Sequence, residues 1–288
     1  MTESSRGPYT PSAARIEREA AARRAARRSS LIAALSTVIA GSILILAVTH
    51  APGWDRVQES FFSWEYAKKS FPDVLQGLWL NIRVMVVCEV FILVIGLGVA
   101  LSRTTRSPVL LPLRIAAAAY TDVFRGLPLL LVIFLLGLGV PALRIEGLTN
   151  SVVVWGAAAL VLTYSAYVAE VLRAGIESVH PTQRMAARAL GLTPAQTTRH
   201  VVLPQAVRRV VPPLLNDLVS LQKDSGLISV LGAIDAIKAA AIDTAMAFNF
   251  TPYVVAGGLF VLLTIPLARY TDWLTARMAG RQQQGVSA

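Results

Sequence analysis

The sequence of 288 residues is too apolar for an ordinary soluble domain. It is 55% hydrophobic and only 15% charged, with a formal net charge of +10, whereas soluble domains contain about 25% charged residues. Long apolar runs alternate with short Arg-rich segments, and no folded polar domain is present to carry a basic patch, which disfavours nucleic-acid binding. The composition predicts an integral membrane protein.

A polar, Arg-rich tail occupies residues 1–30, and the first apolar run follows at Leu31–Val48. The Ala, Arg and Glu content of the tail favours a helix. No small-residue cleavage site follows the apolar run, which is long enough to cross a bilayer, so we predict a retained anchor and not a cleaved signal. The predicted role of the tail is to orient the chain and to attract anionic membrane lipid.

Five further apolar stretches predict additional membrane spans. They are Leu78–Leu101, Pro112–Phe124 continued by Pro128–Val140, Val152–Val171, Leu214–Leu231 and Tyr253–Leu267. The stretch Leu214–Leu231 is the weakest because it contains the charged residues Asp217, Lys223 and Asp224. Gly126 and Pro128 are expected to break or kink the third span and free backbone groups that can line a cavity.

The charges of the connecting segments support six spans. The segments expected in the cytoplasm are 102–111, 176–209 and 275–288, with Arg103, Arg106, Arg184, Arg188, Arg199, Arg208, Arg209, Arg277 and Arg281. The opposite segments, 50–73, 141–150 and 233–250, are neutral or slightly acidic and are expected to be external loops. Without the span Leu214–Leu231, Arg277 and Arg281 would lie outside, against the positive-inside rule. The predicted fold is therefore an all-α, multi-pass protein of the cell membrane, with six transmembrane helices and cytoplasmic N and C termini.

Segment 176–209 has the sequence features of a helix pair. Thr182–Leu190 is rich in alanine and predicts a short helix, which Gly191 ends because glycine adopts the left-handed conformation without strain. Thr193 is an N-cap, followed directly by proline and three residues later by glutamine, which is a capping-box pattern. The second helix is expected to run to Leu203, where Pro204 breaks it.

The first helix of this pair carries Ala186, Ala187 and Ala189, small residues that permit close approach by another surface. A docking site for a soluble protein fits this pattern, and so does an ordinary loop folded over the bundle. The residues alone leave both interpretations open.

The segment resembles the EAA loop of permease subunits of ABC importers. The chain reads Met185-Ala186-Ala187, three residues, Gly191, nine residues and Val201-Val202-Leu203-Pro204, in the spacing of that loop. Three further elements resemble the polar-amino-acid branch of the family: Phe124-Arg125-Gly126-Leu127-Pro128-Leu129, Tyr164-Ser165-Ala166-Tyr167-Val168-Ala169-Glu170 and Leu221-Gln222-Lys223-Asp224-Ser225-Gly226-Leu227. The resemblance covers roughly residues 74–274. Met185 departs from the glutamate of the pattern and Val201 from its isoleucine, and residues 1–73 lie outside the common five-span core.

The resemblance implies that this segment couples the membrane spans to a separate ATPase. The implied coupling residues are Ala186, Ala187, Leu190, Gly191, Leu203 and Pro204. The implied partners are cytoplasmic ABC ATPase subunits, a second permease subunit that is identical or homologous, an external solute-binding protein and an amino acid substrate. The implied mechanism is alternating access driven by ATP hydrolysis in the partner.

Charged side chains within the spans are candidates for the substrate pathway, because they are costly in lipid and usually face a cavity or a partner. The candidates are Glu89, Arg125, Glu170, Lys223 and Asp224. Glu89 fits two roles: contact with the ammonium of an amino acid, or an internal pair with Arg125, which we favour slightly. Glu170 and Arg173 lie near the cytoplasmic end of their span and can reach the interface, so they are weaker candidates. Lys223 and Asp224 point to different helix faces, so each is expected to have a partner elsewhere.

The chain lacks the sequence features of an ATPase or a metal site. No lysine follows a glycine, so the phosphate-binding loop of an ATPase is absent and the chain is expected to be non-catalytic. Cys88 is the only cysteine and the three histidines are far apart in sequence, so neither a metal nor a cofactor is expected in this chain. An ion-coupled secondary transporter remains the alternative function, although the inverted repeats typical of that class are not seen. A membrane scaffold is disfavoured by the charges within the spans.

The predicted domain organisation follows from these elements. It consists of a basic cytoplasmic tail at 1–30, an extra span with an external loop at 31–73, the permease core at 74–274 with its coupling loop at 176–209, and a second cytoplasmic tail at 275–288.

Overall fold

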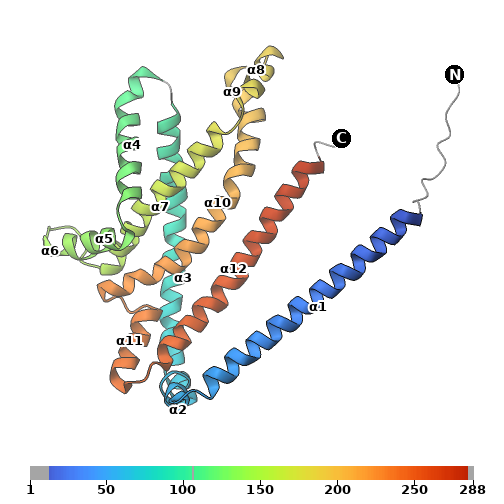
Figure 1. Cartoon of the computed structure of the whole chain (residues 1–288). Helices are drawn as coiled ribbons and strands as arrows, with labels where there is room; N and C mark the ends of the chain where they lie inside the picture. Colours follow the sequence, from blue (N-terminus) through green and yellow to red (C-terminus); the bar gives the residue numbers. More distant parts are fainter. Residues whose placement is uncertain (1–12, 106, 285–288) are drawn as a thin grey trace. The chain divides into compact units, whose positions relative to one another are not determined.

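The computed structural model describes residues 13–105 and 107–284, which form helices joined by short connections (Figure 1). Among these residues no strand occurs, in agreement with the all-α prediction. The predicted tail residues 1–12, the loop residue Arg106 and residues 285–288 lie outside the described residues. The chain divides into two units, one ending at Glu59 and the other beginning at Ser60.

The first unit contains α1 (Ala13–Thr49) and most of α2 (Trp54–Phe61), since the boundary between the units falls within α2. The part Ala26–Thr49 is apolar and long enough to cross a membrane, which confirms the first predicted span. The described part of the predicted tail belongs to the same helix. Segment 50–73, which was predicted to be a loop, is largely helical, because α2 and the first turns of α3 lie within it.

The second unit is a helical bundle in which α3 packs against α7, α11 and α12, and α10 packs against α7 and α12. Its longer helices are α3 (Trp64–Thr104), α4 (Leu111–Gly126), α7 (Val152–Glu177), α10 (Leu203–Asp224), α11 (Ala236–Ala247) and α12 (Thr251–Gln284). Its shorter helical segments are η1 (Pro108–Leu110), α5 (Leu129–Phe134), η2 (Leu135–Gly139), α6 (Val140–Ala142), α8 (Pro181–Ala189), α9 (Pro194–Thr197), η3 (Thr198–Val202) and η4 (Ser225–Leu231). Figure 1 places α8 and α9 at the same end of this unit as the first turns of α4, with α11 at the opposite end. Segments 102–111 and 176–209 thus share an end, as the charge pattern requires.

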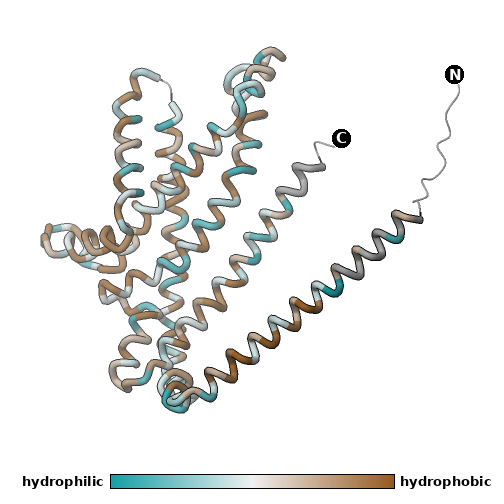
Figure 2. Tube along the Cα trace, in the orientation of Figure 1, coloured by the Kyte–Doolittle hydropathy of each residue, from teal (hydrophilic) through white to brown (hydrophobic). Residues whose placement is uncertain are grey.

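The described residues contain four helical stretches that are apolar and long enough to span a membrane, and up to six if each of two bent pairs is one span. The straight stretches are Ala26–Thr49, Trp54–Thr104, Val152–Glu177 and Thr251–Met278. The six predicted spans correspond to the upper count. The two bent spans differ in hydropathy, as Figure 2 shows. Helix α5 of the third span is almost wholly apolar, whereas polar residues recur along α10 of the fifth.

The predicted break in the third span is present at the sequence Gly126-Leu127-Pro128. Helix α4 ends at Gly126, and the chain turns by 105° before α5 and α6. Leu127 is extended, with φ −86° and ψ 138°, because the ring of the following proline disfavours a helical conformation at the preceding residue.

Pro204 does not break the second helix of the coupling segment, so that prediction was wrong. The helix continues from α9 through the π-helical segment η3 into α10, which begins at Leu203. The N–H of Leu203 bonds to the carbonyl of Thr198, five residues back, and this wider turn accommodates the proline ring and its missing N–H.

Helix α11 lies within segment 233–250, which was predicted to be a loop. Asp235 caps its first turn by accepting from the N–H of Lys238 at 2.9 Å. The side-chain amide of Asn81 on α3 donates to the other carboxylate oxygen of Asp235 at 3.0 Å, and its carbonyl accepts from the N–H of Ala236 at 3.2 Å. Asn81 and Asp235 are both buried, so these bonds fix the start of α11 against α3.

The glycine at position 77 permits this close approach. A Cβ at Gly77 would lie 2.3 Å from the backbone carbon of Asp235 and 2.4 Å from the nitrogen of Ala236. We expect Gly77→Ala to separate α3 from α11 and to destabilise the fold by roughly 1–3 kcal/mol, the usual range for overpacking. Gly98→Ala is the matched control, because a Cβ at Gly98 on the same helix meets nothing within 4 Å. The thermal unfolding midpoint of the purified chain in detergent distinguishes the variants, and equal midpoints would contradict the prediction.

Candidate functional site

The predicted helix pair of the coupling segment is present, and its caps are those that the sequence indicates. Gly191 ends α8 in the left-handed conformation, at φ +82°, and the N–H of Leu192 bonds to the carbonyl of Ala187 at 3.2 Å. Thr193 caps α9: its hydroxyl accepts from the backbone N–H of Gln196 at 3.3 Å, and the backbone N–H of Thr193 donates to the side-chain carbonyl of Gln196 at 2.9 Å. These bonds define the turn between the two helices.

Side chains and a small apolar core anchor the pair to the ends of α7 and α10. The guanidinium of Arg184 on α8 donates to the carbonyl of Ile176 on α7 at 2.7 Å. Arg209 on α10 donates to the carbonyl of Ser178. Beneath them, the buried side chains of Val179, Val202 and Ala206 pack together with Ile176. The segment is therefore a compact extension of the bundle.

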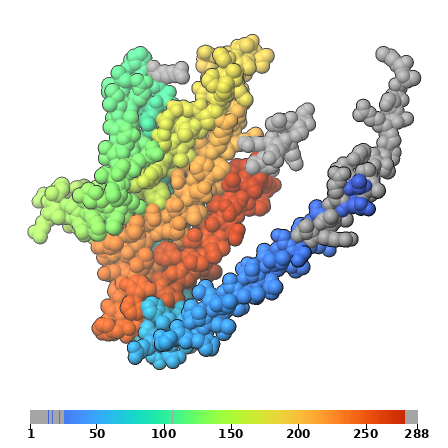
Figure 3. Space-filling model, viewed as in Figure 1, coloured from blue at the N-terminus to red at the C-terminus, as the bar shows by residue number. Residues whose placement is uncertain are grey.

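The outer surface of this extension is apolar in part. Leu190 is 84% exposed and Met185 is 60% exposed, and the space-filling view shows α8 and α9 projecting beyond the neighbouring helices (Figure 3). Of the predicted coupling residues, Ala186, Leu190, Gly191, Leu203 and Pro204 are exposed. Ala187 is buried, with 5% exposure, so it supports the helix from beneath and does not contribute to the outer surface.

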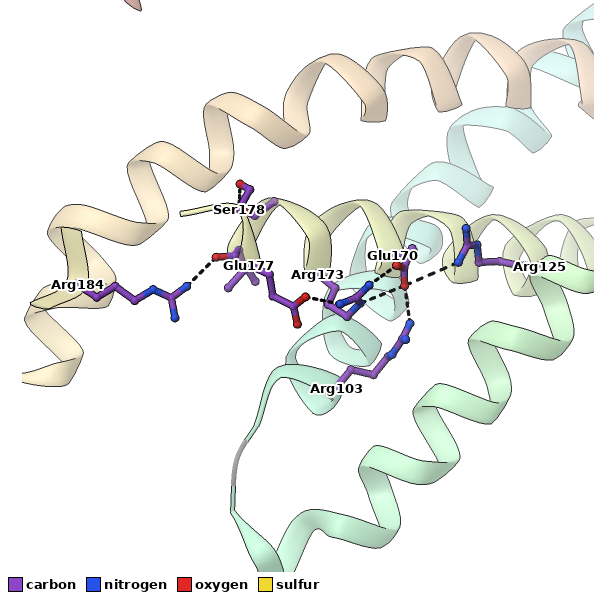
Figure 4. A network of polar contacts seen from close by, with 9 residues as sticks. Arg103, Arg125, Glu170, Arg173, Glu177, Ser178 and Arg184 are labelled. Atoms are coloured by element: carbon purple, nitrogen blue, oxygen red, sulfur yellow. Dashed lines mark hydrogen bonds and ion pairs between the residues drawn. The ribbon is translucent and has the colours of Figure 1, made fainter. Parts of the chain in front are cut away.

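A charged cluster around Glu170 lies at the same end of the bundle (Figure 4). One Glu170 oxygen accepts from Arg103 of α3 at 2.7 Å and lies 3.8 Å from the guanidinium of Arg125 of α4. The other oxygen pairs with Arg173 on α7 itself, and Arg173 also pairs with Glu177. One carboxylate thus links α3, α4 and α7.

This arrangement corrects the expected pairing of Arg125. The sequence suggested Glu89 as its internal partner, but the ion pair of Arg125 is with Glu170. Arg173 was considered only as a weaker candidate beside Glu170, and Arg103 was not recognised as a member of the site. The spacing of Arg173 offered a signal for its ion pair, because it lies three residues after Glu170 and therefore on the same helix face. Arg103 comes from a distant helix, and no local pattern indicates its contact.

The remaining intramembrane candidates have different surroundings. Asp224 accepts from the hydroxyl of Tyr164 on α7 at 2.7 Å, so the expectation of a partner elsewhere is confirmed for Asp224. Lys223 is exposed and lines a largely apolar cavity of about 340 Å³ with residues of α11 and α12. Glu89 is half-buried, and among the described residues it forms no ion pair. On α10, one buried oxygen of Asp217 has no hydrogen-bond partner in the described part of the chain.

Comparison with known proteins identifies the family. Residues 92–280 match the family described as "Binding-protein-dependent transport system inner membrane component". The chain belongs to this family. The match covers the helices from the middle of α3 to α12, including the coupling segment and the Glu170 cluster. The protein is accordingly a multi-pass component of the cell membrane.

Several relatives match most of the second unit. A putative glutamine transport system permease protein of Rickettsia conorii is 36% identical over 205 residues, which cover 70% of this chain and 92% of the relative. A probable glutamine ABC transporter permease protein of Bacillus subtilis is 33% identical, with coverage of 73% and 94%. An arginine transport system permease protein of the same organism is 32% identical, with coverage of 68% and 88%.

Solved structures agree with these relatives. A chain in the crystal structure of an amino acid ABC transporter with histidines has a TM-score of 0.68 and 30% identity, with coverage of 75% of this chain and 98% of that one. A chain of an inward-facing methionine ABC transporter has a TM-score of 0.59 at 20% identity, which shows a similar fold.

The Glu170 cluster provides a stability prediction. Glu170→Gln would leave Arg103, Arg125 and Arg173 close together without their shared carboxylate, and we expect the fold to lose roughly 1–3 kcal/mol. Glu177→Gln is the control, because within the described part of the chain Glu177 pairs only with Arg173, and its side chain is 55% exposed. Thermal unfolding in detergent should show a clear loss for the first variant and little change for the second. A loss of equal size in both would mean that the links to α3 and α4 contribute nothing.

Proposed function

We propose that the chain is the membrane-spanning permease subunit of an ABC importer for amino acids. The family membership, the names of the glutamine and arginine transport relatives and the likeness to an amino acid ABC transporter support this function. The division into two cytoplasmic tails, an extra first span and a permease core at 74–274 is part of the same proposal. The chain itself is proposed to be non-catalytic and to hold no cofactor.

The observation that carries the proposal is the capped and anchored pair α8–α9. A partner can move the spans only through a segment that keeps its own shape, and the caps of Thr193 and Gly191 supply that rigidity. The exposed side chains of Leu190 and Met185 give the segment an apolar surface that a soluble protein can cover. We infer that a cytoplasmic ABC ATPase subunit docks there.

The proposed mechanism is alternating access. Closure of two ATPase subunits on ATP would bring the coupling segments of two permease subunits together and open the bundle toward an external solute-binding protein. The contact of Arg184 with Ile176 would carry this movement into α7. The Glu170 ion pairs would carry it from α7 to α3 and α4. The second permease subunit would be a copy of this chain or a homologue of it.

Leu190→Asp tests the docking surface. Because Leu190 is exposed, the charge should leave the fold intact while it weakens association with the ATPase, by about 2 kcal/mol for the lost burial of one leucine. Affinity purification from the native membrane in mild detergent, with mass spectrometry of the accompanying proteins, measures the association. Val109→Asp is the control, since Val109 is 85% exposed in η1, on the connection to α4.

The outcomes of this purification separate the candidate functions. Recovery of a soluble ATP-binding protein with the wild type and the control, and its loss with Leu190→Asp, is the expected result. If the wild-type chain is folded and no ATPase accompanies it, the ABC proposal fails and an ion-coupled secondary transporter becomes the better interpretation.

The substrate pathway is proposed to include the charged residues of the spans that lack an internal partner. Lys223 is exposed at the level of the spans, and an exposed ammonium is too costly to face lipid. Glu89 lacks an ion pair among the described residues and can accept the ammonium of a passing amino acid. By contrast, Arg125, Glu170 and Asp224 already have partners in the chain. Their proposed contribution is to hold the helices beside the pathway in position.

Glu89→Gln tests this division. We expect the KM of amino acid uptake to rise about tenfold, the equivalent of roughly 1.4 kcal/mol, because a neutral amide binds an ammonium less strongly than a carboxylate does. Uptake into proteoliposomes that contain the complete transporter gives KM, and immunoblotting gives the protein level. The exposed external residue Glu146 serves as the control in the variant Glu146→Gln. A lower protein level with unchanged KM would make Glu89 a structural residue.

A further inference from the structure

A cavity of about 370 Å³ opens between α3 and α11, and none of the sequence predictions assigned a role to it. Its lining residues are Asp73, Gln76, Gly77, Leu80, Arg83, Ile234, Ala239, Ile242 and Asp243. All of them belong to the second unit. Since α11 lies at the opposite end of this unit from the coupling segment (Figure 1), the cavity is on the side that the charge pattern places outside the cell.

The walls of this cavity are fixed relative to each other. Gly77 lets the α3 backbone contact the start of α11. The bonds of Asn81 on α3 with Asp235 and Ala236 then hold the start of α11 against α3. The buried side chains of Val74, Leu78, Ala236, Ala239, Ala240 and Ala256 form a core between α3, α11 and α12. The charged residues of the cavity therefore project from a preformed frame, the condition for selective binding.

The cavity presents charges of both signs, and Lys69, one helix turn before Asp73 on α3, adds a positive charge near Asp243. Arg83 is exposed, and in the described part of the chain it forms neither an ion pair nor a hydrogen bond. Asp243 has one carboxylate oxygen that is buried from solvent and has no hydrogen-bond partner among the described residues. Asp73 adds a second carboxylate to the same lining. That oxygen is closed to solvent, so a ligand in the cavity would meet the accessible part of the partly exposed Asp243, together with Asp73.

The position of Arg83 indicates water and not lipid in the cavity. Arg83 falls inside the predicted span Leu78–Leu101, where an exposed guanidinium facing hydrocarbon would be strongly unfavourable. The size of the cavity lies near the lower end of the range for small-molecule sites, about 300–1,000 Å³. The remaining lining is mostly apolar, from Leu80, Ile234, Ala239 and Ile242. The ligand must therefore be small, carry both charges and have room for an uncharged portion.

We propose that this outer cavity binds the zwitterionic group of an α-amino acid, with Arg83 against the carboxylate and Asp243, supported by Asp73, against the ammonium. The inference rests on the proposed function and adds to it an external binding site, distinct from the intramembrane pathway of Glu89 and Lys223. A planar guanidinium matches a carboxylate with two parallel hydrogen bonds, and a carboxylate is the natural acceptor for an ammonium. The site recognises the carboxylate and the ammonium that all α-amino acids share. Discrimination between amino acid side chains must therefore occur at another site.

The test is equilibrium binding of labelled L-glutamine and L-arginine to the purified full-length chain in lipid nanodiscs. Each amino acid is accompanied by two analogues, one without the carboxylate and one without the amine. For L-glutamine these are 4-aminobutanamide and glutaramic acid. We expect Arg83→Gln to weaken binding of the amino acid and of the deaminated analogue about tenfold and to leave the decarboxylated analogue unaffected. Asp243→Asn should weaken the amino acid and the decarboxylated analogue and spare the deaminated one.

Two variants of the external loop serve as controls, Arg144→Gln and Glu146→Gln, because both residues are exposed and neither lines the cavity. The decisive result is the difference in affinity between the amino acid and its two analogues. A misfolded variant would bind all three ligands more weakly to the same extent. Size-exclusion chromatography of each variant monitors the oligomeric state.

Three results would overturn the proposal: no binding of either amino acid to the wild type, equal effects of each variant on all three ligands, or a changed oligomeric state in place of changed binding. The last result would make Arg83 and Asp243 part of a subunit contact. Failure of this proposal is distinguishable from failure of the proposed function. Amino acid uptake by the complete transporter that is insensitive to Arg83→Gln would refute the outer site alone, whereas the absence of any ATP-driven uptake would refute the function.

Discussion

The ion pairs of the Glu170 carboxylate are the interaction on which the arrangement of helices near the coupling segment depends. Three guanidinium groups from α3, α4 and α7 surround it, and without the shared negative charge they would repel one another in a partly desolvated site. Glu177, two turns further along α7, pairs with the same Arg173 and brings the charge network to the root of α8. The spacing of α3, α4 and α7 is therefore tied to one connected group of side chains, whereas the bonds of Arg184 and Arg209 and the small core around Val179 hold the coupling segment.

Close backbone contacts serve the same purpose along the rest of the bundle. Gly77 lies against the start of α11, a Cβ at Gly96 would lie 2.6 Å from Val168, and one at Gly175 would lie 2.0 Å from Val210. These glycines join α3 to α11, α3 to α7 and α7 to α10. In lipid the hydrophobic effect does not drive helices together, so such contacts supply much of the packing energy. An added methyl group at Gly77 would meet backbone and force a helix to move, whereas at Gly96 and Gly175 it would displace the side chains of Val168 and Val210.

The sequence predicted those features that depend on local chemistry. The apolar runs, the break before Pro128 and the caps at Gly191 and Thr193 follow from neighbouring residues, and the structure contains all of them. The features that were missed depend on distant residues. The bond that fixes α11 against α3 joins Asp235 to Asn81 in another helix, and the partner of Arg125 lies 45 positions away in the chain. Pro204 was misjudged because a π-helical turn, which has no sequence signature of its own, accommodates it.

The charged residues of the second unit fall into two groups, and this division carries the functional argument. Glu170, Asp224 and Asp235 have hydrogen-bonded partners and hold helices together, as buried charges in a stable fold must. Glu89, Lys223 and Arg83 form no ion pair among the described residues, although they lie in segments that cross or enter the membrane. Maintaining such charges there disfavours the fold unless water, solute or a second subunit meets them. The unpaired group occurs on α3 and α10, and under the proposed function these two helices would contribute the faces that meet the solute.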